Sequence, residues 1–374
     1  MNQVFKTGLL LLLVIMGAMG TARAFDLNAN GQISAWFTAA DTGTQGVWEG
    51  GLRFMPEFSF DQDISDTTRI GAEVALNMFM APSTRDTSTE SDLRLYRAQL
   101  RYVTAQSETS AGLQKINFGP GRLLRPLRWF DQINPDDPLQ LTNGVYGIRF
   151  RYNTVKNTGI WLWLLYGNED LKGYEQLQTL KGSFEGGGRI QGEFLKGELA
   201  ASTHLRQVAG GTLGIPDFTE SRLGIDGRWD VGVGLWFEAV LNYQASRFLP
   251  YQWTKLMSAG TDYTFNIGNG LYVLGEHMVS GLSETVFGLN ENVHVSALSL
   301  NYPIGMLDQL TANLYYKWSE SNWYLNLTWR RAYDRFSIYA IGFWNPDAAI
   351  ATGGRQNNVV YGGKGIQIIV VFHY

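Results

Sequence analysis

The stretch that decides the fold is the C-terminal decapeptide, Gly365-Ile-Gln-Ile-Ile-Val-Val-Phe-His-Tyr374. Its alternate positions are all large and apolar, and they hold Ile366, Ile368, Val370, Phe372 and Tyr374. Alternate side chains of a β-strand point to the same face of the sheet. The other face mixes polar and apolar residues. The decapeptide therefore predicts a strand that has one continuous apolar face and ends in an aromatic residue.

The other end of the chain reads as a secretory signal. Lys6 supplies a positive start, residues 9–16 form an uninterrupted apolar run, and Ala22-Arg-Ala24 gives a small-x-small cleavage site. The apolar run is too short to span a membrane as a helix. We expect residues 1–24 to be a signal peptide and residues 25–374 to form a single domain.

Composition excludes several classes of protein. The chain has no cysteine, which excludes a lipoprotein anchor, disulfides, thiolate catalysis and cysteine-based metal sites. Nothing after the signal approaches the ~20 apolar residues of a membrane-spanning helix. Without Lys6 and Arg23, 28 basic residues stand against 34 acidic ones, a net charge of −6, which argues against bulk nucleic-acid binding. The 12 Trp, 18 Tyr, 20 Phe and 43 Gly residues instead suit a wall of amphipathic strands.

Period-two hydrophobicity recurs along the whole mature chain. About 18 segments of 8 to 14 residues show it, and the connections between them tend to alternate between short turns and long polar loops. Residues 319–322 break the alternation, because a long loop is expected at this place and the connection is short. An even number of strands with such connections predicts an all-β fold, a transmembrane antiparallel β-barrel of about 18 strands, with 16 as the alternative.

The signal, the terminal aromatic strand and the alternation of connections together resemble the Gram-negative outer-membrane porins. The resemblance covers the mature chain and identifies no subfamily, although 18 strands match sugar-type porins better than general ones. It implies export through the periplasm, residence in outer-membrane lipid and passive diffusion of small hydrophilic solutes or ions. It also implies assembly-machinery recognition of the C-terminal strand and assembly as a homotrimer. In the porin family the third extracellular loop folds into the lumen, and residues 119–144 match that loop in position and length.

Alternation assigns a group of basic residues to the lumen. On three strands adjacent in sequence the apolar positions, which include Tyr96, Ile116 and Phe118, should face lipid. The intervening positions, which should then face inward, hold Arg97, Arg101, Lys115, Arg149 and Arg151. A basic residue on the lipid face would cost a few kcal/mol at mid-membrane, and this supports the assignment.

The long connection, residues 119–144, is too apolar for a loop that stands in water, because it carries leucines together with Trp129 and Phe130. Folding into the barrel would bury these groups, and the strand that contains Trp161 and Trp163 offers an apolar inner face for them. Its acids should then face the basic cluster across a constriction, and they are Asp131, Asp136 and Asp137. Its arginines recur every third residue, at Arg122, Arg125 and Arg128, but Pro126 interrupts any helix that would align them.

Two interpretations of the basic cluster stay open. The arginines either pair with loop carboxylates to hold the loop in place, or steer solutes and set ion selectivity. The strand around Trp161 and Trp163 is apolar on both faces, so it should either contact another subunit, as in a trimer, or lie under a loop. The inward positions of the second half of the wall are rich in Asn, Ser and Thr and suit neutral or mixed polar solutes.

Catalysis finds little support. The four histidines show no nucleophile–base–orienter pattern, with His204 isolated and His277 and His294 on different strands. Metal-ligand spacing is absent, and no cofactor is implied. We therefore predict a non-enzymatic diffusion porin. The rival hypothesis is a scaffold barrel that sheathes a partner, such as an electron carrier or a secretion component, and has no free conductance.

Overall fold

The computed structural model describes residues 26–41, 43, 46–84, 89–288, 290–345 and 363–374. The predicted signal peptide lies outside the described residues. Within the described ranges no helix has the length and apolar character needed to cross a membrane.

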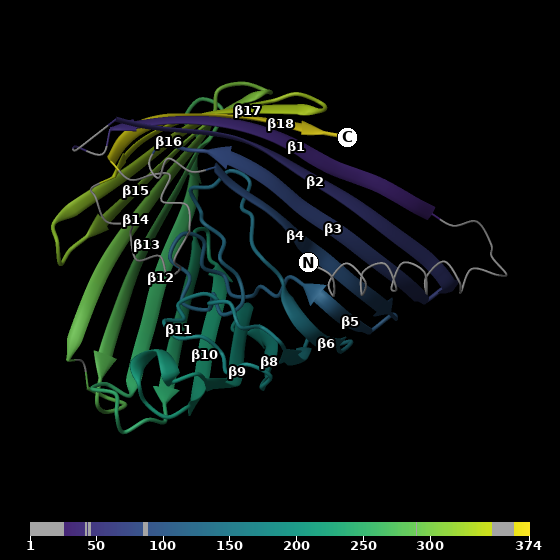
Figure 1. Cartoon of the computed structure of the whole chain (residues 1–374), viewed down its shortest axis with the longest axis vertical. Coiled ribbons are helices and arrows are strands. Elements are labelled where there is room, and N and C mark those ends of the chain that lie inside the picture. The colour runs from purple at the N-terminus through teal and green to yellow at the C-terminus, as the bar shows by residue number, and fades with distance from the viewer. Residues whose placement is uncertain (1–25, 42, 44–45, 85–88, 289, 346–362) are drawn as a thin grey trace.

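The described residues form 18 antiparallel strands in one sheet (Figure 1). The strands are β1 (Asp26–Asp41), β2 (Gly46–Ser65), β3 (Thr68–Pro82), β4 (Thr89–Val103), β5 (Ser107–Gln114), β6 (Val145–Asn153), β7 (Gly159–Tyr166), β8 (Phe184–Phe194), β9 (Gly197–Val208), β10 (Phe218–Asp230), β11 (Gly234–Gln244), β12 (Trp253–Phe265), β13 (Leu271–Ser283), β14 (Glu291–Pro303), β15 (Asp308–Lys317), β16 (Asn322–Ala332), β17 (Phe336–Asn345) and β18 (Gly363–His373). Each strand pairs with its neighbours in sequence, and β1 pairs with β18. The predicted closed barrel and the count of 18 are therefore confirmed.

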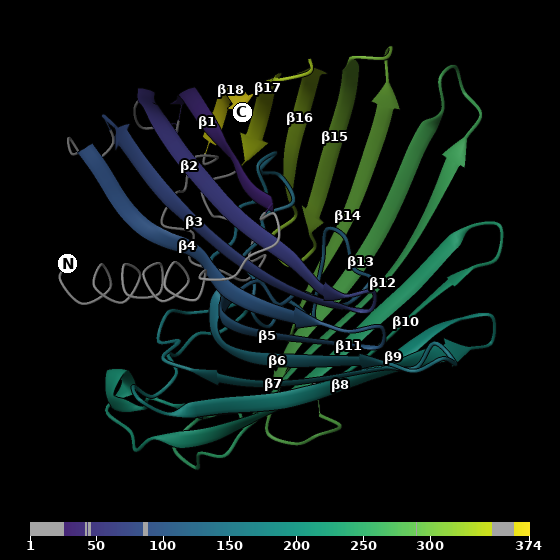
Figure 2. The same ribbon diagram turned by 90° about the vertical axis from the view of Figure 1, so that its right-hand side faces the viewer.

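The wall follows the period-two pattern of the sequence. On β7, Leu162, Leu164 and Tyr166 are half exposed on the outside, whereas Trp161, Trp163 and Leu165 are buried on the inside. The strands run obliquely around the wall (Figure 2), as closure of a barrel requires. Closure gives every strand two partners, so no edge of the sheet is left unpaired in lipid.

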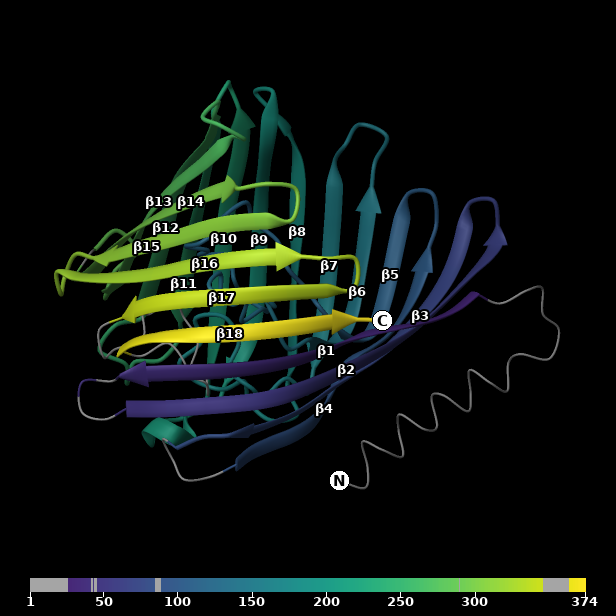
Figure 3. The same ribbon diagram turned by 90° about the horizontal axis from the view of Figure 1, so that it is seen from above.

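The seam of the barrel joins the two ends of the domain. β18 pairs with β1 from Gln32–His373 to Asp41–Lys364 (Figure 3), and its outer face presents Ile366 and Ile368 as the decapeptide predicted. The backbones of Gly31 and Tyr374 exchange hydrogen bonds of 3.3 and 3.2 Å. A Cβ atom at Gly31 would lie 2.5 Å from the Tyr374 hydroxyl oxygen and 2.6 Å from the backbone carbonyl oxygen of Met55, so the position requires glycine.

A β-bulge on β4 changes one predicted face. Ala75 pairs with Arg97 and Leu76 with Leu95, so Tyr96 is an extra residue without a partner on β3. The Tyr96 hydroxyl accepts a hydrogen bond from the backbone N–H of Thr142, 3.4 Å away, inside the barrel. The expectation that Tyr96 faces lipid was wrong, because the bulge turns two successive side chains inward.

The bulge lies beside an interruption of the β2–β3 ladder at Pro56. The ladder between β2 and β3 has no partners for Met55 and Pro56, although the register on either side is unchanged. Proline has no N–H to donate, and the gap it leaves faces the bulged part of the β3–β4 pair.

The fifth strand ends earlier than predicted. β5 stops at Gln114, and residues 115–118 leave the sheet and turn into the barrel. Ile116 and Phe118, which were expected to face lipid, are 1% and 7% exposed in a cluster inside the barrel. The alternation of side-chain faces does not apply at these positions, because it holds only while the backbone is in a β-strand.

Candidate functional site in the lumen

Residues 115–144, here called the crossing loop, connect β5 to β6 and contact the opposite side of the wall. Two wall carboxylates hold its backbone. Glu238 on β11 accepts hydrogen bonds from the N–H groups of Gly121 and Leu127, at 2.7 and 2.8 Å. Glu238 is almost fully buried and belongs to a strand six places around the barrel from β5.

The second of these carboxylates is Glu276 on β13. It accepts three successive backbone N–H groups, those of residues 122–124, at 2.6 to 2.8 Å, and the Trp236 indole N–H at 2.9 Å. Hydrogen bonds to a charged acceptor are about twice as strong as neutral ones. Glu238 and Glu276 therefore fasten the loop to β11–β13.

The apolar side chains of the crossing loop cover the inner face of β7. Phe118 stacks on Trp163 with ring centroids 5.7 Å apart, and Phe130 meets Trp163 edge-on at 5.5 Å. Trp129 and Trp161 pack edge-on against Phe118. Of the two explanations for the doubly apolar strand, the loop cover is the one observed. Trp161 and Trp163 lie inside the barrel, so their assignment as candidates for a subunit interface was wrong.

A second connection, residues 167–183, packs against the crossing loop and is here called the inner loop. Gly173 has a φ of +52°, and a Cβ atom there would lie 1.7 Å from the carbonyl oxygen of Arg128, so the contact requires glycine. The Arg128 guanidinium lies over the Tyr174 ring, 5.1 Å from its centroid. The two loops therefore form one packed layer on the wall.

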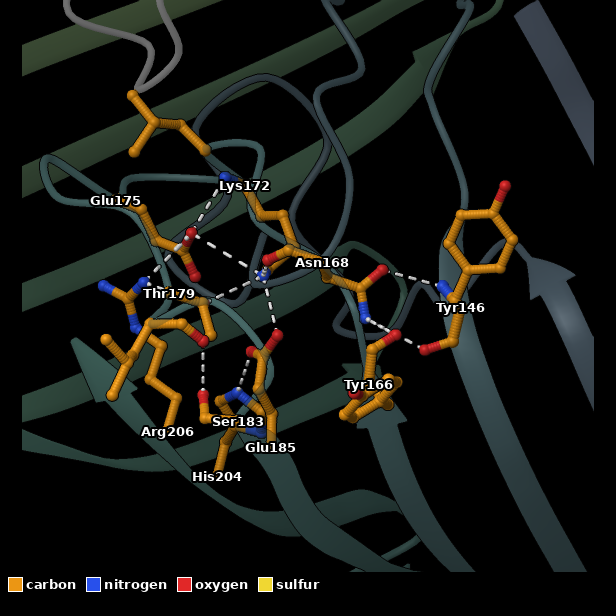
Figure 4. Close-up of polar contacts among 12 residues, drawn as sticks. Tyr146, Tyr166, Asn168, Lys172, Glu175, Thr179, Ser183, Glu185, His204 and Arg206 are labelled. Carbon is orange, nitrogen blue, oxygen red and sulfur yellow. Dashed lines mark hydrogen bonds and ion pairs between the residues drawn. The ribbon is translucent and has the colours of Figure 1, made fainter. Parts of the chain in front are cut away.

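A buried ion network joins the inner loop to β8–β10 (Figure 4). Lys172 binds Glu185 at 2.9 Å, and Glu185 also contacts His204 at 3.2 Å. Farther along, Arg206 and Arg222 alternate with Glu175 and Glu220 in four ion pairs of 2.6 to 3.2 Å. These side chains are at most 6% exposed, and opposite charges within the network compensate the cost of their burial.

His204 sits inside this network with a defined tautomer. The Trp163 indole, which can only donate, lies 3.1 Å from Nδ1, so Nε2 carries the proton that faces Glu185. The interpretation of His204 as isolated was wrong. Its partners were not found from sequence because they come from β7 and β8, which the pairing of β7 with β8 and of β8 with β9 brings beside it.

The predicted basic cluster lies on the remaining side of the lumen, on β4–β6. Arg149 binds Glu108 at 2.8 Å, and Arg151 lies 3.7 Å from Glu108 and 4.1 Å from the centroid of the Trp161 ring. Arg101 approaches Asp61 only to 3.8 Å, and Lys115 is exposed. Arg97 is buried, and it donates to the carbonyl of Thr142 at 3.0 Å.

The arginines of the crossing loop have three different surroundings. Arg125 forms a two-pronged ion pair with Asp131, at 2.9 and 3.0 Å, and both side chains are buried. Arg128 donates to the carbonyl of Ile133 at 2.9 Å, whereas Arg122 is exposed. Their three-residue spacing does not produce a shared face.

The loop acids are also distributed. Asp131 is turned to Arg125, and Asp136 accepts hydrogen bonds from Asn313 at 2.9 Å and Tyr315 at 3.2 Å on β15. Removal of Asp136 from water raises its pKa to about 6. Burial also raises the pKa of Asp137, and the charge of Arg53 opposes that rise.

The residues that sequence reasoning missed are the wall carboxylates and the inner-loop network. Glu238 and Glu276 belong to the second half of the wall, for which the sequence predicted only a polar inner face. The partners of the network were not singled out at all, although β9 carries a readable signal in Ser202, His204 and Arg206 at alternate buried positions. Within the described ranges no group of three or more His, Asp or Glu side chains is arranged to hold a metal ion.

Comparison with known proteins places this arrangement among solved barrels. No protein-family model matches the sequence, and no curated protein matches it. The anion-selective porin from Comamonas acidovorans superposes with a TM-score of 0.53 at 10% identity, over 94% of this chain and 100% of that one. The chain has a porin fold.

Two further porin-fold structures are similar. OccK5 (OpdH) of Pseudomonas aeruginosa gives a TM-score of 0.59 at 11% identity, over 93% of this chain and 97% of that one. OccAB1 of Acinetobacter baumannii gives 0.60 at 8% identity, over 93% of this chain and 96% of that one. At such identities the likeness concerns the fold, and the solute must be argued from the residues of the lumen.

Proposed function

We propose that this chain is an outer-membrane porin through which small hydrophilic solutes or ions diffuse passively. The observation that carries the proposal is the one-sided packing of the lumen. The crossing loop and the inner loop are fastened over β7–β13, and the crossing loop also reaches β15 through Asp136, while charged side chains of β2–β6 remain accessible to water. In this proposal the crossing loop narrows the channel, and the passage lies along β2–β6.

The basic cluster would set ion preference together with nearby acids. Arg101 and Arg151 are 36% and 32% exposed along their side chains, and Asp61 and Glu108 beside them are 37% and 27% exposed. Charges that are partly solvated and loosely paired remain available to a passing ion, unlike the buried pairs of the inner loop. The cluster arginines that form ion pairs do so with the wall acids Asp61 and Glu108 and not with loop carboxylates, which supports the interpretation that they steer ions.

The test is conductance of the purified protein in a planar bilayer, with reversal potentials under a salt gradient. Stable conductance steps are expected, and the sign of the potential gives the net effect of the β4–β6 bases and their acids. A correctly folded barrel without conductance would overturn the proposal and favour the scaffold hypothesis. The apolar inner face of β7, on which a sheathed partner could have docked, is covered by the chain's own loop.

The proposal includes the route to the membrane and the assembly. Export through the periplasm, cleavage near Ala24 and recognition of β18 by the assembly machinery would deliver the barrel to the outer membrane. Mass spectrometry of the mature N-terminus tests the cleavage. Assembly as a homotrimer is tested by native mass spectrometry in detergent. The trimer interface would consist of outward-facing residues, which excludes the inward-facing Trp161 and Trp163.

A further inference from the structure

The outer face of β13–β15 carries a polar cluster that the channel does not use. His277 on β13 and Ser296 on β14 are cross-strand partners, and His294 lies two residues before Ser296 on the same face. Their inward neighbours, among them Glu276 and Val295, are buried, whereas both imidazoles are exposed on the outside. The histidines assigned to separate strands by sequence are thus brought together.

The cluster lies at the edge of the apolar band. One row toward the shorter turns, aligned outward positions hold Leu298, Leu314 and Leu325. At the level of the histidines, the outward residues are Tyr316, Trp318 and Trp323, aromatic side chains typical of the girdle at a membrane surface. The backbone N–H of Trp318 binds the carbonyl of His294 at 3.0 Å. The two imidazoles therefore lie where water and ions can reach them.

Hydrogen bonds orient the first imidazole. The Trp318 indole donates to the Ser296 hydroxyl oxygen at 2.9 Å, and this oxygen lies 2.9 Å from Nδ1 of His277. When Nδ1 of His277 donates to that oxygen, the lone pair of its Nε2 points toward Nδ1 of His294. An imidazole whose second nitrogen donates to an oriented oxygen acceptor is the usual arrangement of a metal ligand.

The spacing of the two nitrogens fits a shared ion. Nε2 of His277 and Nδ1 of His294 are 3.3 Å apart. Two nitrogen ligands at about 2.0–2.1 Å from one ion, separated by a tetrahedral angle, lie about 3.3–3.4 Å from each other. Neutral imidazoles at this spacing can therefore bind one ion with little rearrangement.

We propose that His277 and His294 form a two-imidazole site for a divalent transition-metal ion on the outer rim of the barrel. Water completes the coordination, since within the described ranges no third His, Asp or Glu is positioned to join them. Imidazole ligands select copper, nickel and zinc over magnesium and calcium, and copper(II) binds most tightly. Ser296 and Trp318 position His277 and do not touch the ion. The site is independent of the proposed channel.

The test uses the untagged full-length barrel in detergent, titrated with copper(II) and zinc(II) and followed by calorimetry and by electron paramagnetic resonance of bound copper. One equivalent with two nitrogen ligands is expected. H277Q and H294Q should each lower the affinity about tenfold or more, and S296A should lower it less. H373Q is the matched control, because the remaining histidine, His204, is fully buried.

A second readout avoids any change to the ligands. Bound copper should quench part of the tryptophan fluorescence, and W318F should remove the part that comes from Trp318 while lowering the calorimetric affinity less than H277Q does. Copper binding that survives in the H277Q/H294Q double variant would overturn the proposal. So would an absence of binding by the folded wild-type barrel, in which case the 3.3 Å contact is only a hydrogen bond between two histidines.

Discussion

The two sides of the lumen use the same residue types in opposite ways. On β8–β10, Arg206 and Arg222 are at most 4% exposed and lie within 3.2 Å of their carboxylates. On β4–β6, Arg101 and Arg151 are about one-third exposed and approach their acids only to 3.8 and 3.7 Å. The difference is the layer of loops, which excludes water from the first side. Arginine and glutamate thus form tight buried pairs on the packed side, whereas Arg101 and Arg151 stay partly exposed and loosely paired on the open side.

The largest effect should come from releasing the crossing loop. E276A leaves three backbone N–H groups and the Trp236 indole without their acceptor. Stranded buried donors cost about 1–3 kcal/mol each, so the loop should detach from β13. Single-channel conductance should rise and the thermal midpoint should fall. E57A, at an exposed position on the open side, is the control, and equal behaviour of the two variants would contradict the comparison.

Breaking the buried network should lower the stability of the barrel, but it should raise the conductance less than E276A does. R222M removes a partner of Glu175 and Glu220 and leaves Arg206 to pair with both, with Lys172 3.9 Å from Glu175. Loss of one member of a buried ion pair typically costs about 3–5 kcal/mol. Denaturant unfolding in detergent measures the cost. A loss of unfolding free energy below about 1 kcal/mol would mean that the buried network contributes no more to stability than the exposed pairs of the open side.

Neutralising a charge on the open side should change ion selectivity and leave stability nearly unchanged. R151Q removes a charge that is one-third exposed and 3.7 Å from its acid, and such pairs contribute about 0–1 kcal/mol to stability. We expect unfolding to be nearly unchanged and the reversal potential to shift toward cation preference. R149Q extends the test to a closer pair with the same acid. Unchanged selectivity in both variants would remove these arginines from the proposed channel.

The smallest expected effect is the pH dependence of stability that comes from Asp136. The pKa of Asp136 is about 6 in the folded chain, above the usual value of 3.8, so the folded state binds this proton more tightly than the unfolded state. Stability from this group therefore increases as pH falls from 7 through 6 toward 4, with no further gain below. The thermal midpoint should be slightly higher at pH 5 than at pH 7. D136N should reduce that difference, and an unchanged difference would assign it to another group.

The fold was predictable because its signal is local and repeated. Alternation along each strand sets which side chains meet lipid, so the strand count and the inward positions of Arg149 and Arg151 follow from the sequence. The signal failed where the backbone departs from regular pairing, at the Tyr96 bulge and after Gln114. An extra residue shifts the alternation on one side of it, and alternation no longer applies once the strand has ended.

The candidate site was less predictable because it depends on contacts between distant segments. The fastening of residues 121–127 by Glu238 and Glu276 joins residues more than 100 positions apart, and no local pattern encodes which wall carboxylate meets which loop N–H. Charge complementarity gave the general expectation that loop acids face wall bases. The geometry instead pairs Asp131 within its own loop and sends Asp136 to β15.

The seam between β1 and β18 also bears on how the barrel can form. Every other strand pairs with its neighbour in sequence, so hairpins can appear as soon as their residues are available, whereas the seam joins Gln32 to His373. Contacts between such distant positions form slowly, because ordering the intervening chain costs entropy first. Until they form, two rows of unpaired backbone groups remain open to aggregation or to water. Folding of this chain therefore ends with a single ring-closing event, and a catalyst that shields the two edges would act there.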